Sequence, residues 1–333
     1  MRIPFLLGLI LLLLAACSSK RLDTAKAATP FPIQIERFDS AFFSIDTMHI
    51  AQSVDSLLAR YPHFTNAFLT QILMLPSVKD TQSIKAFYNI YWPVYVAAKN
   101  ANAIKIAQPL LEEGFKRIHF YFPNYVLTHK LVLFVGPFEQ FGNIVTKDAL
   151  AIGLQMHLGE GAHWYASEQM QTIYPAYIRA KFTPIYIAVN SVENIVNDIS
   201  PLRNSGDLIT QIVEAGKRRY VLNACLPSLP DSVIMGYSAK ELKQLQLTES
   251  KIWEYVLAEN LVFSNNEYAI NSFMLDGQDN DIFGEGIPGN IGKYIGYQIV
   301  DAWMQQKAQS KVSIEKLLAT PAHEIFNGAH YKP

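Results

Sequence analysis

The stretch 126–158, VLTHKLVLFVGPFEQFGNIVTKDALAIGLQMHL, decides the fold class. Its two halves, Val126–Val135 and Ile144–Leu158, are apolar and rich in β-branched residues, and Gly136-Pro137 and Gly142-Asn143 separate them. Such runs bounded by turn residues are typical of strands. We therefore expect a hairpin or a pair of adjacent strands at 126–158, inside a chain whose other patterns are mostly helical.

Outward from this stretch, most of the chain has helical spacing. Phe31–Phe38 alternates apolar and polar residues, which predicts one more strand. Ser205 and the capping box Ser238-Ala239-Lys240-Glu241 are typical helix starts. The predicted helices cover about 39–60, 82–99, 103–120, 205–220, 238–261, 289–306 and a short segment after Thr320-Pro321. The helix at 289–306 has Ile291, Ile295, Ile299, Ala302 and Trp303 on one apolar face. No repeat or linker divides these elements, so the sequence predicts an α+β fold, predominantly helical, in a single domain.

The composition describes a folded protein without the charge pattern of a nucleic-acid binder. Half of the 333 residues are apolar and 17% are charged, unlike the polar, highly charged composition of disordered chains. The 28 Lys and Arg residues nearly balance the 29 Asp and Glu residues, so no basic excess is available for a phosphate backbone. We expect no nucleic-acid partner.

The N-terminal segment indicates export and a lipid anchor. Met1-Arg2 precedes the apolar run Ile3–Leu14, which as a helix is about 18 Å long, shorter than the roughly 30 Å of a bilayer core. The run ends in Leu14-Ala15-Ala16-Cys17, which resembles a bacterial lipobox, and acyl chains such as palmitate would be attached to Cys17. The predicted parts are a signal peptide at 1–16, a membrane tether at 17–30 and a globular domain at 31–333.

The residues after Cys17 bear on the destination of this lipoprotein. Ser18-Ser19-Lys20-Arg21 is polar and contains no acidic residue. An Asp after the Cys would resemble an inner-membrane retention signal, and an acidic run would resemble a surface-export signal. Since neither is present, we expect a protein anchored on the periplasmic face of the outer membrane through acyl groups on Cys17. The other cysteine, Cys225, lies in an apolar stretch and is expected to be a buried hydrophobic residue.

The residue types that do chemistry form no strong catalytic pattern. Two His residues four apart on one helix would bind zinc, but no two of the eight His residues are three or four apart. His157, Glu160 and His163 leave an atypical metal site in a loop as an alternative. Gly284–Gly289 matches G-x-G-x-x-G but follows an acidic loop instead of a strand, so we expect no nucleotide. Looser calcium binding by that acidic loop is a further alternative, with the candidate ligands Asp276, Asp279, Asp281 and Glu285. We assign no catalytic, cofactor-binding or metal-binding residue and expect no cofactor.

Short segments in a fixed order carry a resemblance to one family. They are IERFD (35–39), YPHF (61–64), RIHFYFP (117–123), IGL (152–154), YPAYI (174–178), MGY (235–237), KIW (251–253), PGNIG (288–292), IGYQIV (295–300) and IFN (325–327). In their order and spacing the chain resembles the gliding-motility lipoprotein GldB family of Bacteroidetes. The resemblance implies a cell-envelope lipoprotein needed for gliding, whose partners are envelope proteins of the motility and type IX secretion machinery.

The same family is distantly similar to zinc-dependent peptidases with an H-E-x-x-H helix, so the resemblance implies a zincin-like fold. The corresponding helix in this sequence is Pro184–Asp198. There Val192-Glu193-Asn194-Ile195-Val196 keeps the acidic residue and replaces both His residues by Val. Because Val cannot ligate a metal, the resemblance implies a pseudoenzyme, not an enzyme, with Glu193 as the vestige of the former site.

Three functions follow from these observations. The first is a non-catalytic lipoprotein component of gliding motility or type IX secretion. The second is a periplasmic binding module for peptide or glycan, which an open cleft lined by Tyr and Trp would favour. The third is a metal-dependent hydrolase with an atypical site, which a metal bound by His157, His163 and Glu160 would favour.

Overall fold

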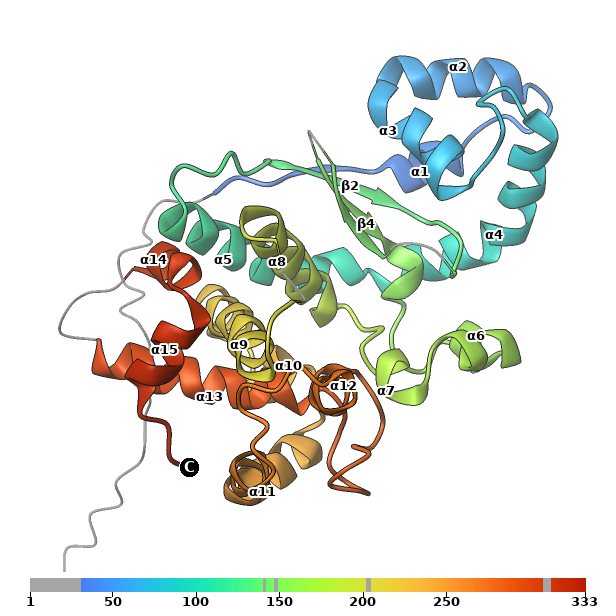
Figure 1. The fold of residues 1–333 in the computed structure, drawn as a ribbon. Helices are drawn as coiled ribbons and strands as arrows, with labels where there is room; N and C mark the ends of the chain where they lie inside the picture. The colour runs from blue at the N-terminus through green and yellow to red at the C-terminus, as the bar shows by residue number, and fades with distance from the viewer. Residues whose placement is uncertain (1–30, 140–141, 147–148, 202–204, 308–312) are drawn as a thin grey trace, which may run out of the picture.

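The structure, a computed structural model, describes residues 31–139, 142–146, 149–201, 205–307 and 313–333 (Figure 1). The predicted signal peptide, Cys17 and the tether lie outside the described residues. The strands are β1 (Gln34–Glu36), β2 (Lys130–Phe134), β3 (Asn143–Val145) and β4 (Leu150–Gly153). The helices are α1 (Phe38–Phe42), α2 (Ile50–Arg60), α3 (Pro62–Ala67), α4 (Thr81–Ala101), α5 (Ala103–Tyr121), α6 (Glu168–Ile173), α7 (Ala176–Arg179), α8 (Ile185–Ile199), α9 (Leu208–Cys225), α10 (Asp231–Met235), α11 (Ala239–Ala258), α12 (Glu267–Met274), α13 (Ile291–Gln306), α14 (Ile314–Ala319) and α15 (Ala322–Ala329).

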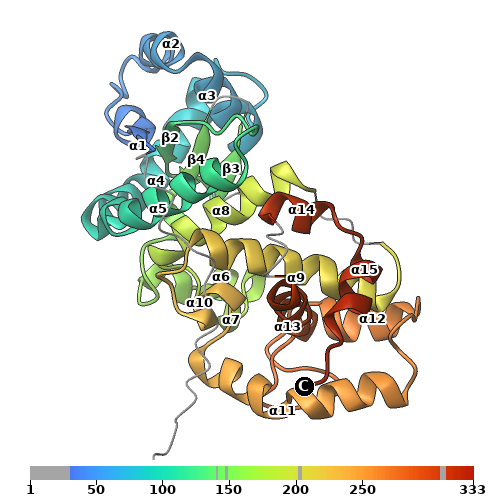
Figure 2. The same cartoon turned by 90° about the vertical axis from the view of Figure 1, so that its left-hand side faces the viewer.

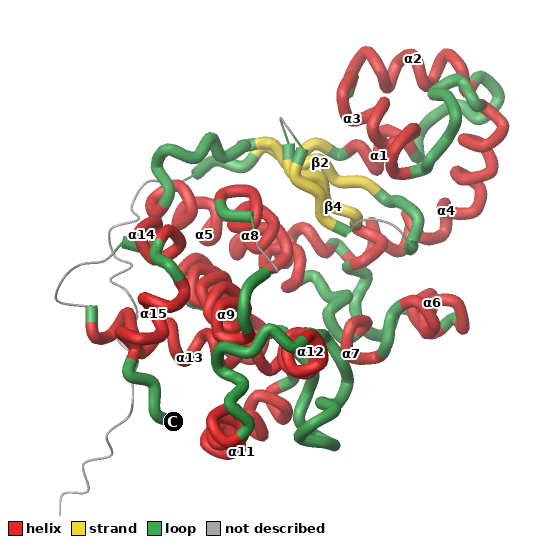
Figure 3. The backbone as a smooth tube through the Cα atoms, in the orientation of Figure 1, coloured by secondary structure: helices red, strands yellow, loops and turns green. Residues whose placement is uncertain are grey.

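The described strands form one four-stranded sheet in the order β1-β2-β4-β3, which is a small region among helices (Figure 3). β1 pairs with β2 and β2 with β4 in parallel, whereas β3 and β4 are antiparallel. The central strands β2 and β4 are almost wholly buried, as expected for apolar runs covered on both faces. Helix α1 packs against β2 and helix α8 against β3. The fold is α+β and predominantly helical, as predicted.

The adjacent strands predicted at 126–158 are confirmed, but a hairpin between the two apolar runs is wrong. Strands β2 and β4 are neighbours and run parallel, with Leu131 opposite Leu150. Parallel neighbours cannot be joined by a tight turn, so the chain between them has to reverse direction. Strand β3 is this return segment. The hairpin lies between β3 and β4, where Thr146 N–H donates to Ala149 O at 2.8 Å.

The single helix predicted at 39–60 is wrong, because the structure has α1 and α2 with an interruption between them. Within the interruption, Asp46 Oδ1 accepts a hydrogen bond from Met48 N at 2.8 Å. Local bonds between side chain and backbone of this kind compete with helical ones. Phe38 of α1 packs edge to face on Phe68, so α1 is held by aromatic packing beside the sheet.

Of the two predicted helix caps, one is confirmed and one is wrong. At the start of α11, Ser238 accepts from Glu241 N while the Glu241 carboxylate accepts from Ser238 N, which is the predicted capping box. At the start of α9 the cap is Asp207 and not Ser205, since Asp207 Oδ1 accepts from Thr210 N at 3.0 Å. A carboxylate at this position also interacts favourably with the positive end of the helix dipole.

Helices α9 and α13 lie side by side at the centre of the C-terminal half (Figure 2). Gly216 of α9 faces Gly296 of α13, and a Cβ atom on Gly216 would overlap the backbone of Gly296. Two glycines therefore allow the helix backbones to touch. Helix α13 buries Ile291, Ile295 and Ile299 completely, which confirms its predicted apolar face.

Buried apolar residues from Phe31 to Ala329 form one continuous core. Across the described ranges, none of the helices combines the length and the apolar character needed to cross a membrane. The domain boundaries and the zincin-like fold stay predictions. The helix expected at 184–198 is present as α8.

Candidate functional site

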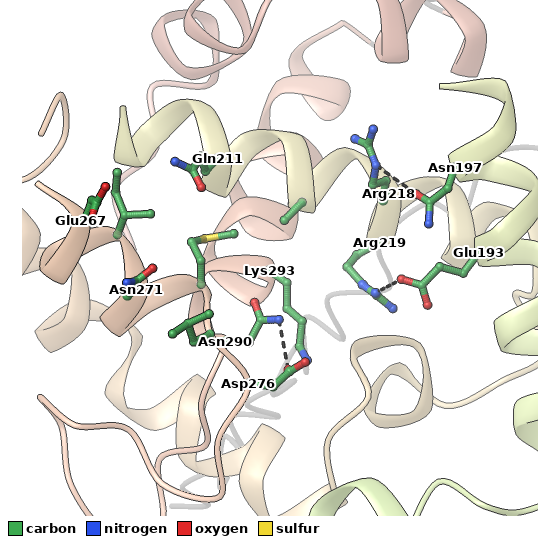
Figure 4. Close-up of a pocket in the computed structure, with 14 residues that line it drawn as sticks. Glu193, Asn197, Gln211, Arg218, Arg219, Glu267, Asn271, Asp276, Asn290 and Lys293 are labelled. Carbon is green, nitrogen blue, oxygen red and sulfur yellow. Dashed lines mark hydrogen bonds and ion pairs between the residues drawn. The ribbon is translucent and has the colours of Figure 1, made fainter. Parts of the chain in front are cut away.

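Helix α8 carries the residue that the sequence identifies as a vestige, Glu193. The flanking Val192 and Val196 are 0% and 1% exposed and belong to the core. Because successive helical residues are rotated by about 100°, Glu193 points elsewhere and forms an ion pair with Arg219 of α9 (Figure 4). At the two positions where the resemblance implies former zinc-binding His residues, the side chains thus belong to the core, and the Glu193 carboxylate is neutralised by a guanidinium.

Glu193 lines a cavity of about 580 Å³ between α8, α9, α12 and the start of α13 (Figure 4). Its walls are mostly polar. The lining residues are Glu193, Asn197, Gln211, Ala215, Arg218, Arg219, Glu267, Ile270, Asn271, Met274, Leu275, Asp276, Asn290 and Lys293. We call this space the first cavity.

A second cavity of about 450 Å³ lies next to it, because Asp276 and Lys293 line both. The second cavity is walled by the segment between α7 and α8, by the connection from α10 to α11 and by the loop before α13. Tyr177, Tyr186 and Tyr237 contribute aromatic surface to it. The rings of Tyr177 and Tyr186 are partly exposed, as expected for a binding module, whereas Tyr237 is 8% exposed and belongs to the core.

Lys293 separates the two cavities and is 6% exposed. Its Nζ lies 3.7 Å from Asp276 Oδ1 and 4.3 Å from the centre of the Tyr237 ring. Burial and, to a lesser extent, the positive charges of Arg219 and Lys181 lower the pKa of Lys293 to about 7. The site therefore contains an ammonium group that titrates near neutral pH.

Two helix ends position these groups. Gly236 ends α10 in the left-handed conformation, with φ +69°, which glycine adopts without strain. The chain then places Tyr237 so that its hydroxyl donates to Asn290 O at 2.6 Å, immediately before α13. Lys293 follows in the first turn of α13, above the Tyr237 ring.

The structure does not bring His157, Glu160 and His163 together as a metal site. His157 is buried, and its ring nitrogens lie 3.2 Å from Thr183 O and 3.1 Å from Asn143 Oδ1. Both nitrogens thus contact protein atoms. His163 is exposed, and Glu160 lines the second cavity. In the part of the chain that the structure describes, no three His, Cys, Asp or Glu residues form a group that could hold a metal.

The remaining candidates have structural roles. Cys225 is fully buried, as expected, and burial raises the pKa of its thiol to about 12. In the glycine-rich loop, Gly284 and Gly286 have positive φ, and Gly286 N donates to Asp279 Oδ1 at 2.9 Å. Asp276, from the same acidic stretch, faces Lys293.

Burial of His157 predicts a loss of stability in mild acid. Desolvation lowers its pKa from 6.5 to about 4 in the folded protein. Between these values the unfolded chain binds a proton that the folded chain does not, so stability is retained above about pH 6.5 and lost as the pH falls toward 4. The loss amounts to about 2 kcal/mol at pH 5. Urea unfolding at pH 7.5 and pH 5 measures it.

Two variants make this test specific. His157→Gln should reduce the difference in unfolding free energy between the two pH values, whatever its effect at pH 7.5. His163→Gln, on the surface, is the matched control and should keep the wild-type difference. An unchanged difference in His157→Gln would contradict the assignment.

Sequence reasoning identified Glu193 but missed Lys181, Arg219 and Lys293. The sequence contained one hint, Lys293, a charged residue in the first turn of the helix predicted at 289–306, whose apolar residues lie on one face. A lysine in the first turn of a helix is also unfavourable for the helix dipole. Its neighbours in the site come from distant segments, so spacing along the chain could not reveal them.

The fold and the paired cavities define a mostly helical α+β protein with a small mixed sheet and a charged pocket between helices α8, α9, α12 and α13. The family described as "Gliding motility protein GldB" matches residues 19–333, and the chain belongs to this family. The resemblance found in the sequence is confirmed. No curated protein and no solved structure matches the chain.

Proposed function

We propose that this protein is a lipoprotein anchored by acyl chains on Cys17 to the periplasmic face of the outer membrane, where it acts in gliding motility without catalysing a reaction. Membership of the gliding-motility family over residues 19–333 is the observation that carries this proposal. Its partners are envelope proteins of the motility and type IX secretion machinery. The lipobox at 14–17 supports the anchor.

The non-catalytic part of the proposal is supported by helix α8. Val192 and Val196 offer no metal ligand and are buried in the core. The Glu193 carboxylate is paired with Arg219, which reduces its availability as a general base. Protein contact is then the mode of action that this helix favours.

Genetic complementation tests both the lipid anchor and the non-catalytic role. In a gliding strain that lacks its own gene of this family, wild-type protein and Glu193→Gln should restore colony spreading, because Gln keeps a hydrogen-bond acceptor for Arg219. Cys17→Ala should fail to restore spreading. It should also lose incorporation of labelled palmitate and move from the membrane to the soluble fraction.

Three results would contradict the proposal. Full spreading with a soluble Cys17→Ala protein would remove the need for an anchor. Loss of spreading in Glu193→Gln at wild-type protein level would indicate catalysis. Mass spectrometry of the purified protein that finds one zinc per chain would contradict the pseudoenzyme interpretation.

A further inference from the structure

The Lys293 side chain is buried, and its ammonium group has only long contacts with Asp276 and Tyr237. An ammonium has three N–H donors. Nζ lies 3.7 Å from Asp276 Oδ1, beyond ordinary hydrogen-bond distance, and 4.3 Å from the centre of the Tyr237 ring. Nζ nevertheless faces the space of both cavities, since Lys293 lines each of them. Burying a charge with unsatisfied donors is costly unless another group completes its surroundings.

A second ammonium group lies close to the first. Lys181 Nζ and Lys293 Nζ lie 3.4 Å and 3.8 Å from the point that a Cβ atom on Gly236 would occupy. Any side chain at Gly236 would fill the space between them. The glycine thus leaves room beside two lysines that both line the second cavity.

The carboxylates that line the two cavities are partly held by other contacts, and Glu160 also lines the second cavity. Glu193 is paired with Arg219, and Glu241 accepts the hydrogen bond of its own helix cap. Asp276 is the remaining carboxylate near Lys293, and it also accepts from Asn290 Nδ2 at 3.1 Å. The positive end of α13 adds to the positive potential at Lys293.

We propose that the junction of the two cavities binds the anionic group of a small molecule, a carboxylate or a phosphate, between Lys181 and Lys293. Oxygen atoms of such a group accept several hydrogen bonds at once, including those of the two ammonium groups. The rest of the ligand lies along the tyrosines of the second cavity, Tyr177 and Tyr186. This proposal does not depend on the lipid anchor or on the role in gliding.

The protonation of Lys293 supports this site and offers a readout that a purely structural role would not change. Burial lowers its pKa most; of the charged groups facing it, Arg219 and Lys181 lower the pKa further, and Asp276 and Glu193 raise it. The net result is a pKa of about 7. A bound anion stabilises the charged form, so binding should take up a proton near pH 8 and weaken as the pH rises.

The test uses the full chain, purified in non-ionic detergent, and isothermal titration calorimetry with inorganic phosphate and with citrate. Chloride at matched ionic strength is the reference. We expect saturable binding of at least one of the two anions and none of chloride. Stronger binding of phosphate would indicate a phosphorylated ligand, and stronger binding of citrate a carboxylate ligand.

Matched variants locate the site. Lys293→Met and Lys181→Met keep side-chain length and remove one charge each, and each should weaken binding by roughly tenfold or more, the effect of losing one hydrogen bond to a charged group. Lys105→Met, at an exposed position of α5, should bind as the wild type does.

The pH dependence of binding is a further test. Sulfate has a constant charge between pH 6 and pH 8.5, and it should bind the wild type roughly tenfold more tightly at pH 6 than at pH 8.5. Lys293→Met should lose most of this pH dependence.

Two outcomes would overturn the proposal. The first is the absence of saturable binding of phosphate and citrate to the wild-type protein. The second is equal binding to wild type and Lys293→Met, which would place the anion elsewhere. Circular dichroism of each variant confirms that it is folded before binding is measured.

Discussion

Gly216→Ala is expected to destabilise the protein by roughly 3 kcal/mol or more, at the upper end of the effects of overpacking. The new methyl group would overlap the carbonyl group of Gly296. Backbone atoms cannot move aside as the end of a flexible side chain can. Helices α9 and α13 would have to separate, and the core that they share would loosen. Urea unfolding followed by circular dichroism measures the change.

Two further variants sharpen this prediction. Gly296→Ala should have a similar effect, because its Cβ would overlap the carbonyl oxygen of Ile212. Gly161→Ala is the matched control, since a Cβ there meets no atom within 4 Å, and it should change stability by less than about 1 kcal/mol. Wild-type stability in Gly216→Ala would mean that the two helices do not touch as described.

Glu214→Ala is expected to cost roughly 3 kcal/mol, the lower end of the effect of removing one partner of a buried ion pair, because the Glu214 side chain itself is 21% exposed. Lys217 and Arg218 are 1% and 5% exposed, and both contact the Glu214 carboxylate. Lys217 Nζ also donates to Thr320 O at 2.6 Å, which connects α9 to the segment between α14 and α15. Without Glu214, two buried cations would lose their carboxylate.

The control variants for this prediction separate charge from hydrogen bonding. Glu214→Gln keeps an acceptor for Lys217 and should fall between the wild type and Glu214→Ala. Glu254→Ala, at an exposed position of α11, should stay within about 0.5 kcal/mol of the wild type. A loss of less than 1 kcal/mol in Glu214→Ala would show that the two cations find other partners or water.

The sequence predicted some local features correctly and missed others, and the difference depends on which residues determine each feature. The capping box at Ser238 and the apolar face of α13 depend on residues three or four apart, and the sequence predicted both. The interruption between α1 and α2 depends on a competing bond at Asp46, which the apolar spacing of the segment does not reveal. Strand direction was equally hidden, because an apolar run is compatible with a parallel or an antiparallel neighbour.

The fold class, most of the helices and the membership of the gliding-motility family could be predicted from the sequence, because these depend on composition, local spacing and the order of short segments. The pairing of Glu193 with Arg219 and the closeness of Lys181 and Lys293 to Gly236 are visible only in the packed structure. These residues come from segments far apart along the chain. Their charges and burial combine into a site only after α8, α9 and α13 have packed together.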